Sequence, residues 1–152
     1  MRKLVNMVLD KVNKRYADVL TNLCKWNYTT VVRTHYKLRE HIADKKINNL
    51  VNSGLVDSAF LTLENDTDYS DRYTIAKPMN HMHLLLYVPN KIKNYNTYKG
   101  YFANAINVNI GAVLNIEPVR GRYQITRYVT KHLGMKGSHH NFYSNNSILS
   151  NT

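Results

Sequence analysis

The sequence predicts an α+β fold, with helices in the first third of the chain and strands from about residue 55 onward. Apolar residues recur at intervals of three and four between Val5 and Leu23, which indicates an amphipathic helix. After Gly54 the pattern changes to short apolar runs separated by turn-forming residues, which indicates strands. At 152 residues the chain is long enough for one domain with a substantial core.

The pattern places the elements in a definite order. The first helix is followed by a second one from about 30 to 52, which ends at Gly54. Residues 26–32 are rich in β-forming residues, so this segment can instead begin as a strand. Strand patterns occupy 55–64, 73–76, 80–88 and 112–118, and helical patterns occupy 96–106 and 124–133.

The division of the chain follows from this order. Residues 1–55 form a helical N-terminal extension and residues 56–136 form the core, so that 1–136 make up a single domain. Residues 137–152 are rich in Ser and Asn, and we expect them to form a flexible tail.

Two histidines lie near the start of the third predicted strand. His81 and His83 are two residues apart, and alternate residues of a strand share a face, so both imidazoles should emerge on the same side. Two neighbouring imidazoles can hold one divalent ion when a third ligand, usually a carboxylate, completes the site. Such an ion polarises a phosphodiester oxygen and leaves the phosphorus open to attack.

Composition narrows the choice of the third ligand. Five of the ten acidic residues fall between positions 57 and 71, just before the histidine strand. Glu64 belongs to a predicted strand that should lie near the histidine strand, and Asp71 begins the approach to His81. We take Glu64 as the first choice and Asp71 as the second. The alternative for this cluster is a solvated acidic loop.

A tyrosine on the last predicted helix supplies the nucleophile that a metal site lacks. Three apolar residues of 125–133 repeat at helical spacing, and Gly134 is a natural stop. Tyr128 lies at the edge of this apolar stripe, and Lys131 lies one turn further along. A phenol has an ordinary pKa of about 10, so attack at neutral pH needs a nearby cation or metal. We expect Tyr128 to be catalytic and Lys131 to stabilise the developing charge.

These motifs resemble those of HUH-class endonucleases, specifically the rolling-circle replication initiators (Rep proteins) of small plasmids and viruses. Residues 60–63 resemble the first motif of these proteins, and residues 81–83 resemble the second. Residues 113–120 resemble the strand before the tyrosine helix, and residues 127–133 resemble the third motif. Many such proteins carry a second tyrosine four residues after the first. Because His132 stands at that position, this chain resembles the single-tyrosine type.

The resemblance implies a ferredoxin-like (RRM-like) antiparallel sheet with packed helices and a Mg or Mn ion as cofactor. It also implies that the enzyme nicks single-stranded DNA at an origin through a 5′-phosphotyrosine, and that the free 3′-hydroxyl primes synthesis. The chain has no Gly-x-x-x-x-Gly-Lys phosphate loop, so a host or replicon helicase and polymerase would act with it.

The charge of the chain also favours a nucleic-acid partner. The formal net charge is +11 and the isoelectric point is near 9.8, and neutralising phosphates releases condensed counterions. After residue 90 there are eight lysines and arginines and one acid. Of these we expect Arg120, Arg122 and Arg127 to contact DNA. Unstacked bases can lie on the interleaved tyrosines Tyr95, Tyr98, Tyr101 and Tyr123.

The cysteine count and the first residues of the chain indicate the cellular compartment. A single cysteine, Cys24, suits a reducing interior, and the first residues contain neither a continuous apolar run nor a small-residue cleavage site. We therefore expect a cytoplasmic protein with no membrane partner. The N-terminal helices can cover the sheet, bind duplex flanks or pair protomers as a homodimer. The alternative functions are an HUH single-strand transposase and a non-catalytic nucleic-acid-binding protein with structural histidines.

Overall fold

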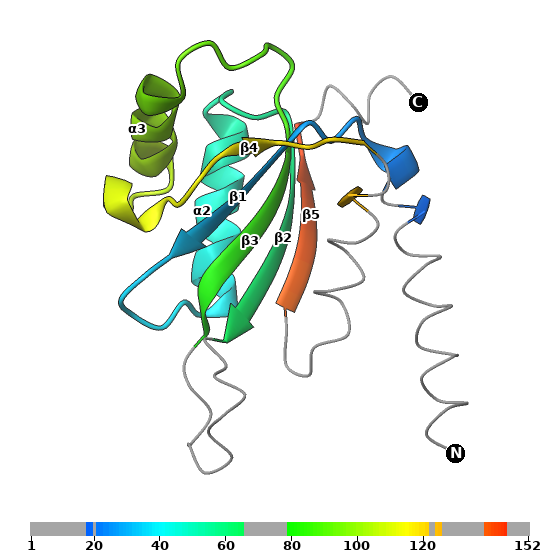
Figure 1. Cartoon of the computed structure of the whole chain (residues 1–152). Helices are drawn as coiled ribbons and strands as arrows, with labels where there is room; N and C mark the ends of the chain where they lie inside the picture. Colours follow the sequence, from blue (N-terminus) through cyan, green and yellow to red (C-terminus); the bar gives the residue numbers. More distant parts are fainter. Residues whose placement is uncertain (1–17, 20, 66–78, 122–123, 126–138, 146–152) are drawn as a thin grey trace, which may run out of the picture.

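A computed structural model gives the fold of the chain (Figure 1). It describes residues 18–19, 21–65, 79–121, 124–125 and 139–145, and at residues 64, 65, 79 and 80 it describes the backbone alone. The elements in chain order are β1 (Tyr28–Arg33), α2 (Glu40–Asn52), β2 (Ser58–Asn65), β3 (Met79–Tyr87), α3 (Tyr95–Ala105), the 3₁₀ turn η1 (Ile110–Ala112), β4 (Glu117–Pro118) and β5 (His139–Ser144).

The five strands form one antiparallel sheet in the order β4-β1-β3-β2-β5. Strand β3 lies at the centre and pairs with β1 on one side and with β2 on the other. Both α2 and α3 lie on the same side of the sheet (Figure 1). The predicted α+β class is therefore confirmed, with helices packed on an antiparallel sheet.

The main core lies between the sheet and the two helices. Met82, Leu84 and Leu86 alternate along β3 and are fully buried, as are Ile47 of α2 and Phe102 of α3. Helix α2 buries residues spaced three and four apart, which explains why this stretch is helical. The helix stops where predicted, because Gly54 adopts a φ of 83° that favours glycine.

Several predicted elements agree with the structure, and others differ. The predictions of strands at 55–64 and 80–88 and of a helix at 96–106 are confirmed by β2, β3 and α3. The second helix begins only at Glu40, because residues 28–33 form β1. Of the predicted strand at 112–118, only Glu117–Pro118 is a strand, together with an isolated bridge between Val32 and Val113. The predicted strand at 73–76 lies outside the described residues.

In β1, every second residue is buried under the helices. Tyr28, Thr30 and Val32 are buried, whereas the residues between them are more exposed. A period of two fits a strand and not a helix, and six consecutive residues pair with β3. The strand alternative for this segment is the correct one.

Part of the C-terminal segment belongs to the sheet. Residues 139–144, which the sequence assigns to a flexible tail, instead form β5 and pair with β2 at six positions. Tyr143 is 6 % exposed and belongs to the main core. The Ser- and Asn-rich composition hides this strand, because its stability comes from contacts with distant residues.

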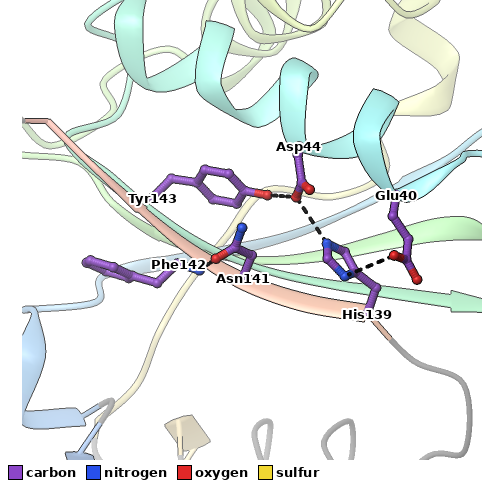
Figure 2. Close-up of polar contacts among 6 residues, drawn as sticks. All are labelled: Glu40, Asp44, His139, Asn141, Phe142 and Tyr143. Carbon is purple, nitrogen blue, oxygen red and sulfur yellow. Dashed lines mark hydrogen bonds and ion pairs between the residues drawn. The ribbon is translucent and has the colours of Figure 1, made fainter.

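A polar cluster joins β5 to α2 (Figure 2). The Tyr143 hydroxyl donates a hydrogen bond to Asp44 Oδ1, and His139 Nε2 lies 3.1 Å from the same oxygen. His139 Nδ1 lies 3.7 Å from Glu40 Oε2. Burial alone would raise the pKa of Asp44, but hydrogen bonds from Tyr143 and His139, with the charge of His139, outweigh it and lower this pKa. The carboxylate therefore anchors the edge strand.

Removal of the Tyr143 hydroxyl should weaken this anchor. We expect Tyr143→Phe to lower the free energy of unfolding by about 1.5–3 kcal/mol, because a hydrogen bond to a charged group is lost while the ring still packs. Urea denaturation of both proteins at pH 7 measures the difference. Tyr36→Phe is the control, because this ring is 51 % exposed and its loss of a hydroxyl should change the stability by less than about 0.5 kcal/mol.

The same difference should depend on pH. A carboxyl group whose pKa is lowered in the folded state stabilises the protein above its unfolded pKa of about 3.9, and this contribution disappears as the pH falls through the lowered value. The gap between Tyr143→Phe and the unmodified protein should therefore shrink below pH 4. A gap that is absent at pH 7, or that grows in acid, would contradict the anchor.

In the part of the chain that the structure describes, none of the helices combines the length and the apolar character that a lipid bilayer requires.

Candidate metal site and nucleic-acid face

His81 and His83 lie on the face of the sheet opposite α2 and α3. Their neighbours Met82 and Leu84 are buried under the helices, so the alternation of β3 turns both histidines to the other side. The two imidazole rings have centroids 6.2 Å apart and an interplanar angle of 80°, and both side chains are partly exposed. The predicted arrangement of two neighbouring imidazoles on one face, here named the histidine face, is thus present.

Strand register brings a carboxylate-bearing residue next to this pair. Glu64 of β2 is the direct partner of His81 in the β2–β3 ladder, and Thr62 is the partner of His83. Directly opposed residues share a face, with Cβ atoms about 4.5–5.5 Å apart. The backbone therefore places residue 64 beside His81. Asp71, the second choice, lies outside the described residues.

The donor set can be compared with what a divalent ion needs. Among the side chains that the structure describes, no three His, Cys, Asp or Glu residues gather as a metal-binding group. Of the three candidate ligands, the structure describes the side chains of His81 and His83 and only the backbone of Glu64. Thr62 Oγ1 is buried on the histidine face and has no hydrogen-bond partner among the residues that the structure describes. A buried hydroxyl of this kind needs a polar partner such as a water. The described side chains therefore supply two imidazole donors of a kind that divalent ions accept, and an ion would need a carboxylate as its third ligand.

Arg33, which the sequence pattern did not single out, also lies beside His81. Arg33 of β1 is the partner of His81 on the side away from Glu64, and it is exposed. Arg33, His81 and Glu64 therefore run across three adjacent strands on one face. No local pattern indicates this, because the neighbourhood exists only through the register of β1 on β3.

A third histidine also lies on this face. His140 of β5 is the partner of Thr62, which is itself the partner of His83. Two strand spacings separate His140 from His83, which is about 10 Å. The ring of His140 lies 6.3 Å from that of Phe60.

A small apolar cluster lies further along the histidine face. It consists of Trp26, Phe60, Leu85 and Ile125. Leu85 follows His83 by two residues on the same side of β3, and Phe60 is its partner on β2. Ile125 is buried here, as the predicted apolar stripe of 125–133 requires. The chain therefore lies against the histidine face three residues before Tyr128.

The turn before Ile125 directs the chain onto this face. Gly121 has a φ of 109°, which is a conformation that glycine tolerates, and its carbonyl accepts a hydrogen bond from the Ile125 amide. The Gln124 side chain accepts a hydrogen bond from the Arg120 amide at 2.6 Å. Arg120 itself is exposed. The other predicted functional residues, Tyr128, Lys131, Arg122 and Arg127, lie outside the described residues.

Cys24 packs beside the small apolar cluster. Burial raises the pKa of its thiol to about 11, and a hydrogen bond with Ser58 offsets only part of this effect. A thiolate is therefore scarce at neutral pH, and this thiol is poorly suited to act as a nucleophile.

The histidine face thus combines two adjacent imidazoles, an arginine and a residue 64 in register, and it lies against the segment that leads to Tyr128. Comparisons of the chain with protein-family models, with curated proteins and with solved structures return no match.

Proposed function

We propose that the protein is a metal-dependent enzyme of the HUH class that nicks and rejoins single-stranded DNA at a replication origin. The observation that supports this most is the shared location of His81, His83 and Ile125. The paired imidazoles and the segment just before the tyrosine motif lie on one face of the same sheet. A metal-held phosphate and a phenol nucleophile need this proximity.

The order of the elements supports the corresponding fold. From β1 to β4 the chain runs strand, helix, strand, strand, helix, strand, which is the order of a ferredoxin-like domain. Strands β1 and β3 occupy the centre, and β5 extends the sheet beyond β2. Because α2 and α3 pack on one face of the sheet, the histidines lie on the other face, where a substrate would bind. We infer a ferredoxin-like HUH nuclease fold.

The metal would be Mg or Mn, held by His81, His83 and Glu64. Imidazole and carboxylate ligands suit these ions when open positions remain for substrate oxygens. When bound, the ion would polarise the scissile phosphate. Arg33, on the other side of His81, would donate charge-assisted hydrogen bonds to a phosphate oxygen. These bonds would hold the DNA strand in position.

Tyr128 would be the nucleophile. Ile125 packs on the histidine face, and Tyr128 follows it by three residues, which span at most about 10 Å. The phenol oxygen would form a bond to phosphorus while the bond to the 3′-oxygen breaks, which leaves a 5′-phosphotyrosine and a free 3′-hydroxyl. Lys131 would stabilise the charge, the phenol proton would pass to solvent, and the departing 3′-oxygen would take up a proton from solvent. Attack of a 3′-hydroxyl on the same link reverses the step, so no nucleotide is hydrolysed.

A covalent-adduct assay tests this proposal. The protein is incubated with a labelled, origin-like single-stranded oligonucleotide and Mn, and the products are separated under denaturing conditions. We expect a protein–DNA adduct whose modified peptide contains Tyr128. A shifted band on a native gel without any adduct would instead indicate a non-catalytic binder. Adduct formation that requires transposon-end hairpins would indicate the transposase.

The identity of the third ligand is testable separately. We expect Glu64→Gln to weaken Mn binding beyond the roughly 10- to 100-fold loss that follows removal of an outer-shell partner, because a charged ligand of the ion is lost. Isothermal titration with Mn measures the affinity. Asp71→Asn is the matched control and should bind Mn as the unmodified protein does. The reverse result would assign the ligand to Asp71.

A further inference from the structure

A pocket lies at the far end of β3 from the histidine pair. It is bounded by the loop after β3, the first turns of α3 and the segment just after α2, and its volume is about 410 Å³. This lies within the range of about 300–1,000 Å³ that is typical of small-molecule sites. Val88, in its wall, follows His81 by seven residues, a distance of roughly 23 Å along the strand. The pocket is therefore separate from the candidate metal site.

Two hydrogen bonds, one buried and one partly buried, hold the walls of the pocket in place. The Ile92 amide donates to the Tyr28 hydroxyl at 3.0 Å and fixes the loop after β3. The Tyr98 hydroxyl donates to the Leu55 carbonyl at 2.8 Å and joins α3 to the segment after α2. Burial raises the pKa of Tyr98, so this hydroxyl keeps its proton at neutral pH. These bonds tie the loop after β3 and helix α3 to the rest of the fold around the cavity.

The chemistry of the lining fits an unstacked base with its phosphates. Leu55, Val88 and Ile92 give the pocket apolar surface, and Tyr101 lines it with 62 % of its surface exposed. The exposed lysines Lys91 and Lys93 lie at the same pocket. Among the described residues that line it, none is acidic. An aromatic ring beside two cations can stack a base while the lysines neutralise phosphates.

We propose that this pocket is a second subsite for single-stranded DNA. One base stacks on Tyr101, and Lys91 and Lys93 contact the phosphates on either side of it. The inference rests on the proposed function for the identity of the polymer, but it needs neither the metal nor Tyr128. It assigns the pocket to substrate binding and not to the chemical step.

Binding of a fluorescent oligothymidylate in the presence of EDTA tests the subsite apart from catalysis. We expect Tyr101→Ala to weaken binding by between about 5-fold and 100-fold, because a stacking face is lost. Tyr101→Trp should retain the affinity, since the larger ring still stacks. Tyr36→Ala is the matched control, because this tyrosine is also exposed and does not line the pocket, and it should bind as the unmodified protein does.

The contribution of Lys91 and Lys93 can be measured from the salt dependence of DNA binding. In the double variant Lys91→Gln/Lys93→Gln, the slope of log affinity against log salt concentration should fall in magnitude by about 1.4, which corresponds to two phosphates of a single strand. The control Lys37→Gln/Lys45→Gln removes two exposed lysines elsewhere and should leave the slope unchanged. Thermal unfolding of each variant shows whether it remains folded.

The outcomes separate this inference from the proposed function. If Tyr101→Ala binds as tightly as the unmodified protein, the subsite is overturned, whatever the cleavage assay gives. If binding depends on Tyr101 and the lysine pair but no adduct forms with Mn, the subsite stands and the proposed function fails. If the unmodified protein does not bind single-stranded DNA at all, both are wrong.

Discussion

Tyr128→Phe is expected to abolish the covalent protein–DNA adduct while single-stranded DNA still binds. Phenylalanine keeps the ring but lacks the oxygen that would attack phosphorus, so no bond to DNA can form. The loss should exceed about 10³-fold, because no other group replaces a missing nucleophile. The measurement is adduct formation with Mn and a labelled oligonucleotide, followed by mass identification of the modified peptide.

Tyr123→Phe is the matched control for this experiment. Tyr123 lies five residues earlier in the same region of the chain, and its replacement should leave adduct formation unchanged. If only Tyr123→Phe abolishes the adduct, our assignment of the nucleophile is wrong. If both variants form the adduct, the nucleophile lies elsewhere in the chain.

The second large effect is expected when either histidine of the pair is replaced. His81→Ala and His83→Ala should each reduce nicking by more than about 100-fold, because removal of a ligand costs more than removal of an outer-shell partner. Both variants should also bind Mn more weakly in isothermal titration. Treatment of the unmodified protein with EDTA should stop nicking, and added Mn should restore it.

His35→Ala provides the comparison. His35 is exposed and lies beyond the end of β1, away from the ladder positions that hold the pair. Its replacement should change neither Mn affinity nor nicking. If His83→Ala nicks and binds Mn like the unmodified protein, the histidines are structural, and the non-catalytic interpretation gains support.

Local patterns were sufficient for the central part of the fold. Strands β2 and β3 are short apolar runs, so their existence could be predicted without knowledge of their partners. Helix α3 begins where the Asn94 side chain accepts a hydrogen bond from the Thr97 amide, and this kind of start depends on neighbouring residues alone. The same local rule placed His81 and His83 on one face, because alternation is a property of any strand.

Other parts of the fold depended on distant contacts. Residues 28–33 had both helical and strand interpretations, and pairing with β3 decided for the strand. Strand β5 has a tail-like composition, yet Tyr143 hydrogen-bonds Asp44, which lies 99 residues earlier. The stability of such contacts depends on the entropy of loop closure and on competing strand pairings. Neither can be read from a window of neighbouring residues.

Three features follow from local patterns alone: the α+β class, the common face of the two histidines and the kinds of side chain at the candidate site. The positions of residues 33 and 64 on either side of His81, and the packing of Ile125 on the same face, became known only from the folded chain. These neighbourhoods depend on how the strands are aligned with one another. A shift of one residue in the pairing of either ladder would turn Arg33 or Glu64 to the opposite face without changing any local pattern.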